Sequence, residues 1–272
     1  MQSTDPTGTV GEGLSHEERG TPGAPRLVLI HGFTQSALSW EPIVTQLSDR
    51  FEIITVDLPG HRGSDVNRAP DLDTTAALVG AVGGQAIYCG YSLGGRVALT
   101  LACQSPSLVH ALVVVSTSPG IADSTERAHR RQADERLAER LSPRDGSASE
   151  LTLNQFLDEW LALPLFSHLD EHMSDRESRG QNTLSGLAHS LRSAGLGSMR
   201  PLFENLAACT MPVRCLAGAL DERYATIAKE MATAMGTGAQ AHIIEGVGHA
   251  LPFEAPEALV RVLDEISVAI SP

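Results

Sequence analysis

A serine between two glycines carries the clearest chemistry in this chain. Ser92 stands in Gly90-Tyr91-Ser92-Leu93-Gly94, directly after an apolar run. This Gly-x-Ser-x-Gly pattern is typical of a sharp turn from a strand into a helix, which lifts the serine hydroxyl clear of the backbone. Glycine is needed on both sides because a Cβ there would clash. The pattern also occurs by chance in glycine-rich turns, so a catalytic role for Ser92 depends on partners elsewhere in the chain.

A reactive serine needs an imidazole to take its proton and a carboxylate to orient that imidazole. His242 lies within a predicted strand, whereas His249 follows that strand on a glycine-rich loop and is the better base. Asp221 ends another predicted strand, and its neighbour Glu222 is expected to be a solvated first residue of the next helix. The order Ser92, Asp221, His249 is the one that this kind of turn requires.

Backbone N–H groups near the serine could stabilise a developing negative charge. The amide of Phe33, just after the first predicted strand, and that of Leu93, just after the serine, could converge on one oxygen. The polar residues His31, Asp57 and His61 lie in loops at strand ends, and we expect them to order those loops by hydrogen bonds.

Arginine side chains near the serine indicate an anionic ligand. Arg96 lies four residues after Ser92 and therefore one helical turn onward on the same face. The ordinary alternative is pairing with a surface carboxylate, but a helix leaving such a turn is normally covered, and an unpaired buried charge is costly unless a ligand answers it. Other arginines after residue 119 could each be ordinary helix-surface charges. These are Arg127, Arg130, Arg131 and Arg179.

Apolar runs separated by helix-length segments predict an α/β fold with a doubly wound, mostly parallel sheet. Residues 119–201 show helical patterns without a convincing strand, which predicts a helical cap standing over the carboxyl ends of the strands. We therefore expect a flexible leader at 1–25, a core at 26–118 and 202–272, and a cap at 119–201. The expected strands are 27–30, 53–56, 87–90, 112–115, 213–217 and 242–244. The expected helices are 37–47, 74–82, 93–104, 227–235 and 256–269 in the core, and 126–141, 150–163, 170–179 and 184–193 in the cap.

The composition excludes several other classes of function. With 42% hydrophobic and 19% charged residues, the chain has the balance of a soluble globular protein, and no window approaches the roughly 18 apolar residues of a membrane span. A net charge of −13 at pH 7 opposes binding to nucleic acid or to an anionic membrane. The first 25 residues have neither a basic start nor an apolar stretch, so we expect a cytoplasmic protein. The four cysteines form no C-x-x-C pair, which favours buried thiols over disulfides or metal ligands.

From about residue 26 to its end, the chain resembles the α/β-hydrolase superfamily, because the four segments described above lie at strand ends in the expected order. The fold alone leaves the reaction undecided. Within that superfamily the chain resembles the 2-succinyl-6-hydroxy-2,4-cyclohexadiene-1-carboxylate synthases of menaquinone biosynthesis. The similar segments are His31-Gly32-Phe33-Thr34, Gly90-Tyr91-Ser92-Leu93-Gly94-Gly95-Arg96-Val97-Ala98, Trp160 before Leu163-Pro164-Leu165-Phe166, Arg179-Gly180-Gln181-Asn182 and Gly248-His249-Ala250.

The resemblance implies a lyase that eliminates pyruvate from 2-succinyl-5-enolpyruvyl-6-hydroxy-3-cyclohexene-1-carboxylate, with a serine base, no acyl-enzyme, and no cofactor or metal. It implies a small anionic polycarboxylate substrate, for which planar guanidinium groups are suited. Arg131 is an alternative to Arg130 by one position, and Arg62 stands where relatives commonly have a second glycine. The implied site comprises a catalytic triad of Ser92, Asp221 and His249, oxyanion donors Phe33 and Leu93, and substrate-binding residues Tyr91, Arg96, Arg130, Trp160 and Arg179.

Two other functions remain open from the residues. One is a carboxylesterase or carbon–carbon hydrolase in which Ser92 is a true nucleophile. The other is a ligand-binding receptor with a vestigial triad. The oligomeric state cannot be inferred from the sequence.

Overall fold

The computed structural model describes residues 14–64 and 70–269, and its framework is a seven-stranded sheet in the order β1-β3-β2-β4-β5-β6-β7. All neighbouring strands pair in parallel except β1, which pairs antiparallel with β3. The inner strands are almost wholly apolar because a parallel sheet is covered on both faces. The strands are β1 (His16–Gly20), β2 (Arg26–Ile30), β3 (Glu52–Val56), β4 (Ala86–Tyr91), β5 (Val109–Val115), β6 (Val213–Gly218) and β7 (Ala239–Ile244).

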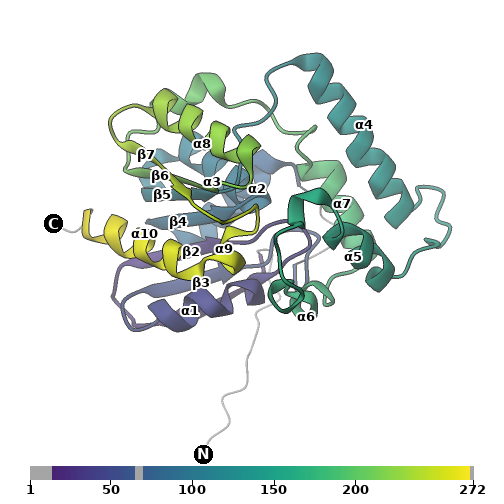
Figure 1. Cartoon of the computed structure of the whole chain (residues 1–272), viewed down its shortest axis with the longest axis horizontal. Coiled ribbons are helices and arrows are strands. Elements are labelled where there is room, and N and C mark those ends of the chain that lie inside the picture. Colours follow the sequence, from purple (N-terminus) through teal and green to yellow (C-terminus); the bar gives the residue numbers. More distant parts are fainter. Residues whose placement is uncertain (1–13, 65–69, 270–272) are drawn as a thin grey trace, which may run out of the picture.

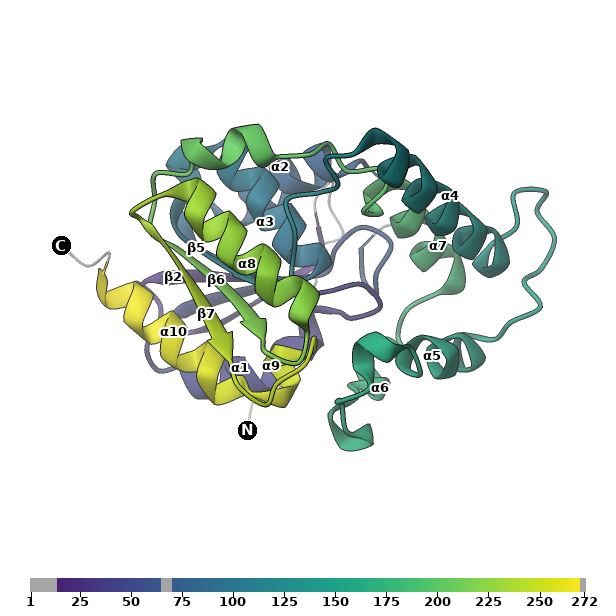
Figure 2. The ribbon, with the colours of Figure 1, turned by 45° about the horizontal axis from the view of Figure 1, so that its top comes forward.

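Helices cover the two faces of this sheet in two groups (Figures 1 and 2). The helices α2, α3 and α8 pack with one set of strand side chains, whereas α1 and α10 pack with the other set. This arrangement confirms the predicted α/β-hydrolase fold with a doubly wound sheet. The core helices are η1 (Ala37–Trp40), α1 (Glu41–Leu47), α2 (Leu72–Gly83), α3 (Leu93–Gln104), η2 (Pro106–Leu108), α8 (Glu222–Met235), α9 (Leu251–Glu254) and α10 (Pro256–Ala269).

Between β5 and β6 the chain forms a group of helices beyond the carboxyl ends of the strands (Figure 2). These cap helices have a small apolar core of their own, centred on Phe156, Leu157 and Leu187, against which Phe33 packs from the sheet side. The cap helices are α4 (Ser124–Leu141), α5 (Leu153–Leu161), η3 (Pro164–Phe166), η4 (Glu171–Met173), α6 (Arg176–Arg179) and α7 (Leu184–Ala194), and η5 (Phe203–Ala208) leads back to β6.

Two sequence expectations are wrong in detail. The predicted flexible leader extends to residue 25, but His16–Gly20 form the edge strand β1; residues 1–13 lie outside the described part. The weaker helical piece expected at 170–179 is divided into η4 and α6, because Asp175 adopts a left-handed backbone with φ of 55°. In the described residues, no helix is both long and apolar enough to cross a membrane.

Arg62 stands where relatives commonly have a second glycine, and it links β1, the loop of Asp57 and the cap. Its backbone has a φ of 38°, a region that favours glycine, and its N–H donates to the cap residue Asn182. Its guanidinium contacts Glu17 of β1 at 3.0 Å and the buried Asp57 at 3.2 Å. A second cap contact joins its Nε to Gln181 at 3.2 Å. These contacts tie the cap to the sheet and exceed what a glycine could make.

Candidate active site

The turn between β4 and α3 holds Ser92 in a strained conformation, with φ of 52° and ψ of −106°. The flanking glycines are required by space: a Cβ at Gly90 would lie 2.2 Å from the carbonyl of Gly94, and one at Gly94 would lie 2.1 Å from that of Ile30. Thr117 donates a 2.7 Å hydrogen bond to the Ser92 carbonyl, which helps to hold the turn. The local geometry is that of a nucleophile elbow.

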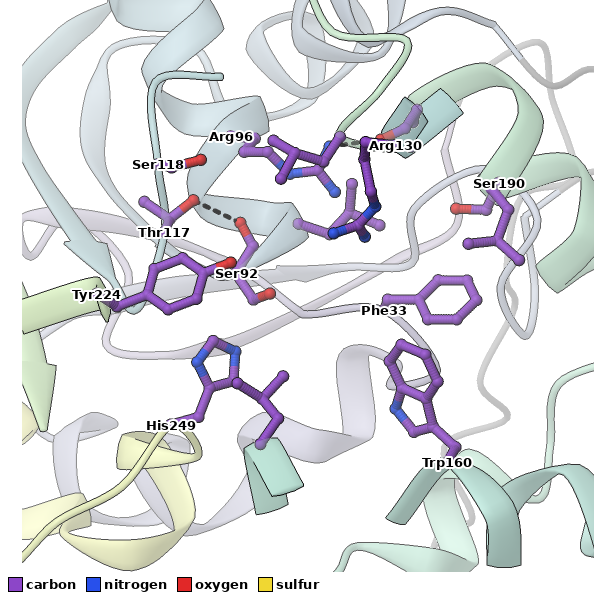
Figure 3. A pocket seen from close by; sticks show the side chains of 16 residues that line it. Phe33, Ser92, Arg96, Thr117, Ser118, Arg130, Trp160, Ser190, Tyr224 and His249 are labelled. Carbon is purple, nitrogen blue, oxygen red and sulfur yellow. Dashed lines mark hydrogen bonds between the residues drawn. The ribbon is translucent and has the colours of Figure 1, made fainter. Parts of the chain in front are cut away.

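His249 and Asp221 form a buried pair beside this turn. Nδ1 of His249 lies 2.6 Å from Oδ2 of Asp221, and the side chains are 2% and 9% exposed. A carboxylate only accepts hydrogen bonds, so Nδ1 carries the proton and Nε2 is left to act as a base. His249 and Ser92 line the same cavity, and no hydrogen bond between these two described residues is present (Figure 3). The predicted triad residues are therefore assembled at one place.

A carboxylate that the sequence reasoning missed holds the loop of His249. Glu254 of α9 accepts hydrogen bonds from the amides of Gly248 at 2.6 Å and of Ala250 at 2.9 Å, so it bridges the backbone on either side of the imidazole. Nothing in the spacing of the sequence distinguishes this glutamate from a surface residue. It is a positioning residue, because it acts on the backbone and not on the cavity.

The cavity in front of the serine has a volume of about 110 Å³ and opens between the sheet and the cap. The structure brings most of the predicted site residues to its wall. They are Ser92 and His249, the two predicted amide donors Phe33 and Leu93, and Arg96, Arg130 and Trp160. The amides of Phe33 and Leu93 donate to no other described group, so both are available to an oxyanion.

Arg96 projects from the first turn of α3 and has no carboxylate partner among the described residues. Its Nη1 donates to the carbonyl of Ala194 at 2.7 Å. Burial lowers the pKa of Arg96 to about 10, and the positive charge of Arg130 contributes in the same direction. A desolvated guanidinium without a counter-ion, on the wall of a cavity, fits an anionic ligand.

Arg130 and Trp160 reach the cavity from the cap. Arg130 and Arg131 are both exposed, but Arg130, which is paired with Asp134 at 2.8 Å, lines the cavity and Arg131 does not. The Trp160 ring packs on Phe33 with centroids 5.0 Å apart, and its buried Nε1 has no partner among the described residues. Trp160 therefore lines the cavity and carries an N–H donor that no described residue uses.

Two predicted substrate-binding residues do not line this cavity. The Tyr91 side chain is buried beneath His249, with ring centroids 5.6 Å apart, and burial raises the pKa of its hydroxyl. Arg179 is 1% exposed and donates to the carbonyl of Ser174 at 2.8 Å and to the hydroxyl of Thr34. These bonds connect α6 to the loop of Phe33. Their roles toward a substrate stay predictions.

The loop histidines behave as expected. His31 donates through Nδ1 to the carbonyl of Gly32 at 2.8 Å and accepts through Nε2 from the amide of Leu58 at 3.0 Å. Burial lowers the pKa of His31 to about 4 and that of its neighbour His61 to about 3, so both are neutral near pH 7. The rival triad residues lie elsewhere: Glu222 is exposed and His242 lies on β7, and neither lines the cavity.

The sequence reasoning also missed Tyr224, which lies on the wall of the cavity next to His249. Its position three residues after Asp221 was the only available signal. No group of three or more His, Cys, Asp or Glu side chains within residues 14–64 and 70–269 could hold a metal ion. All four cysteines are unpaired thiols, and Cys103, the least buried of them, lies 3.9 Å from Cys209 through their sulfurs.

Comparison with known proteins agrees with this geometry. Residues 27–262 match the model of the alpha/beta hydrolase family. Two relatives from Salmonella paratyphi C and Salmonella heidelberg, both named 2-succinyl-6-hydroxy-2,4-cyclohexadiene-1-carboxylate synthase, are 33% identical over 254 and 258 residues. These alignments cover 91% of this chain and 95% of each relative.

Solved structures show the same likeness. MenH from S. aureus is 27% identical, with a TM-score of 0.84 over 96% of this chain and 99% of that chain. A thermophilic esterase from Thermogutta terrifontis is 21% identical, with a TM-score of 0.77 over 95% of this chain and 94% of that chain. At this lower identity the esterase shows likeness of fold alone.

Proposed function

We propose that this chain, which belongs to the alpha/beta hydrolase family, is a lyase of that fold with the activity named for its Salmonella relatives. The reaction is elimination of pyruvate from 2-succinyl-5-enolpyruvyl-6-hydroxy-3-cyclohexene-1-carboxylate. The product is 2-succinyl-6-hydroxy-2,4-cyclohexadiene-1-carboxylate, an intermediate of menaquinone biosynthesis.

The observation that carries the proposal is Arg96 on the cavity wall without a carboxylate partner among the described residues. The proposed substrate has three carboxylates, and one of them would supply the missing counter-charge. A second guanidinium, that of Arg130, reaches the same cavity from the cap. A neutral ester has no charge to balance these guanidinium groups, so its binding would not offset the desolvation cost of Arg96.

In the proposed mechanism Ser92 acts as a base and not as a nucleophile. His249 accepts the hydroxyl proton of Ser92 through Nε2, and Asp221 keeps the proton of the imidazole on Nδ1. The ring proton at C2 of the substrate is acidic because the carbon lies between the succinyl ketone and the C3–C4 double bond. Its transfer to Ser92 leaves an enolate, whose oxygen the amides of Phe33 and Leu93 would stabilise.

The electron pair then moves through the ring. The enolate collapses to form the C2–C3 double bond, the C3–C4 double bond shifts to C4–C5, and the C5–oxygen bond breaks. The electrons of that bond leave with the oxygen as enolpyruvate, which takes up a proton to become pyruvate. The C2 proton restores the Ser92 hydroxyl, and protonated His249 gives up its proton to the departing enolpyruvate, so that both residues return to their starting states. No water is consumed, and no covalent bond to the enzyme forms.

The experiment measures pyruvate release from the enolpyruvyl substrate by the wild-type protein and by Ser92→Ala. Because triad members act as a unit, we expect the variant to lose at least about a thousandfold in kcat. Its thermal unfolding should be unchanged, since the hydroxyl lies at the cavity and fills no core space. Near-wild-type release by Ser92→Ala would remove the serine from the mechanism. A wild-type protein that cleaves activated esters efficiently but releases no pyruvate would be a serine hydrolase.

A further inference from the structure

Tyr224 is tied to the triad through its backbone and its ring. It lies in the first turn of α8, and its amide donates to Oδ1 of Asp221 at 3.3 Å, the oxygen that His249 does not use. The ring packs against the His249 imidazole, with centroids 4.8 Å apart and an angle of 56° between the planes. The same carboxylate thus orients the imidazole and places the tyrosine.

The Tyr224 hydroxyl is not used by the protein. The side chain is partly buried, and its oxygen makes no hydrogen bond to any described residue. The residue lines the cavity together with Ser92 and Arg96, and its phenol points into the cavity (Figure 3). Because Tyr224 and Arg96 line the same cavity, one ligand bound there can contact both side chains.

We propose that Tyr224 is a specificity-determining residue, whose hydroxyl donates a hydrogen bond to the substrate carboxylate held by Arg96. The inference rests on the proposed function for the identity of that carboxylate. An ionised carboxylate has about four acceptor sites, more than one guanidinium edge fills. Part of the Arg96 edge is already used by the carbonyl of Ala194.

A neutral donor suits this position better than another cation would. Arg130 already lowers the pKa of Arg96 by repulsion, so a third positive charge would add to that repulsion. A phenol adds directional hydrogen bonding without adding charge. It therefore distinguishes a carboxylate from an uncharged group of similar shape.

The test compares Tyr224→Phe with the wild-type protein. The substitution removes only the oxygen and keeps the ring against His249, so the thermal unfolding midpoint should be unchanged. Tyr88→Phe is a matched control, because it also removes a single phenol oxygen. The Tyr88 hydroxyl donates to the carbonyl of Gly84 at 2.6 Å, and Tyr88 does not line the cavity.

The probe is 2-succinylbenzoate, an aromatic dicarboxylate with the ring carboxylate and succinyl arm of the proposed product, and its affinity is measured by titration calorimetry. Hydrogen bonds to charged groups lead us to expect a Kd about tenfold or more higher for Tyr224→Phe, and an unchanged Kd for Tyr88→Phe. The dimethyl ester of the probe should bind the wild type and Tyr224→Phe equally. With the enolpyruvyl substrate, Tyr224→Phe should raise KM and leave kcat within about threefold.

An equal Kd for the dicarboxylate in the wild type and Tyr224→Phe would overturn the proposal. An equal loss of affinity of Tyr224→Phe for the dimethyl ester would also overturn it, because the hydroxyl would then not distinguish a carboxylate from a neutral ester. The calorimetric measurement requires no turnover. A protein that fails to release pyruvate but shows the expected Kd pattern would therefore contradict the proposed reaction and leave Tyr224 as an anion-reading residue.

Discussion

Replacing Arg96 by methionine should separate stability from function. Methionine keeps the length and apolar stem of the side chain and removes the guanidinium. Lowering the pKa of Arg96 from the ordinary arginine value to about 10 corresponds to an environment that disfavours the charged form by about 3 kcal/mol. The hydrogen bond to the Ala194 carbonyl offsets about 1 to 2 kcal/mol of this. We therefore expect Arg96→Met to unfold at the same temperature as the wild type or a few degrees higher.

The same substitution should impair catalysis. Loss of one partner of a desolvated charge pair costs about 2 to 5 kcal/mol, which corresponds to a fall in kcat/KM of roughly 30-fold to several thousandfold. Arg96→Lys should recover only part of this activity, because an ammonium cannot present a planar pair of donors. The assays are thermal unfolding and steady-state pyruvate release.

Arg192→Met is the matched control for this prediction. Arg192 is 16% exposed and pairs at 3.0 Å with both Glu135 and Glu139 within the cap. Its removal leaves Glu135 with Arg144 and leaves Glu139 without an ion pair among the described residues. This variant should lose stability and keep its kcat/KM near wild type. If Arg96→Met instead loses more than about 2 kcal/mol of stability and keeps its kcat/KM, Arg96 is a structural residue and the reasoning is refuted.

Three further predictions follow from the same geometry. Asp221→Asn should lower kcat by several orders of magnitude, because an amide can stabilise the wrong tautomer of His249, and full activity would contradict the triad. Glu254→Gln leaves one acceptor oxygen for two backbone amides, so the free energy of unfolding measured by chemical denaturation should fall by about 1 to 3 kcal/mol. The kcat should also be lower, and a variant with unchanged stability and kcat would contradict the positioning role of Glu254. His31 and His61 have pKa values of about 4 and about 3 when folded, below the ordinary 6.5, so their contribution to stability is present above pH 6.5 and is lost as the pH falls toward 4. The free energy of unfolding in urea should fall by up to about 3 kcal/mol per pH unit from this pair, and a flat profile between pH 6.5 and 4.5 would contradict their buried neutral state.

The inner strands of the sheet could be predicted because each is a short apolar run in the sequence, and helix-length segments separate most of these runs. The edge strand β1 could not, since His16–Gly20 reads HEERG and four of its five residues are exposed. Such a strand is defined by backbone pairing with β3, which leaves no mark in side-chain polarity. The break at Asp175 has a similar cause, because a left-handed residue inside a helical pattern is set by packing and not by propensity.

The candidate site divides in the same way. Ser92, Asp221 and His249 could be found from the sequence because each follows a strand, and parallel strands end at one edge of the sheet. Tyr224 and Glu254 could not, because the direction of a side chain near the end of a helix depends on how that helix packs. The low exposure of Arg179 was equally hidden, since an arginine in a cap helix reads as a surface charge until its neighbours are known.

The most direct test of the account is the ratio of conjugated diene to pyruvate during turnover of the enolpyruvyl substrate. Elimination forms one diene for each pyruvate, whereas hydrolysis of the same ether would release pyruvate and leave an alcohol on a ring with a single double bond. We predict equal amounts of diene, followed by its absorbance, and of pyruvate, followed by a coupled reduction, from the first turnover onward. Pyruvate released without the diene, or a covalent adduct on Ser92 seen by mass spectrometry of the quenched reaction, would contradict a serine that acts as a base.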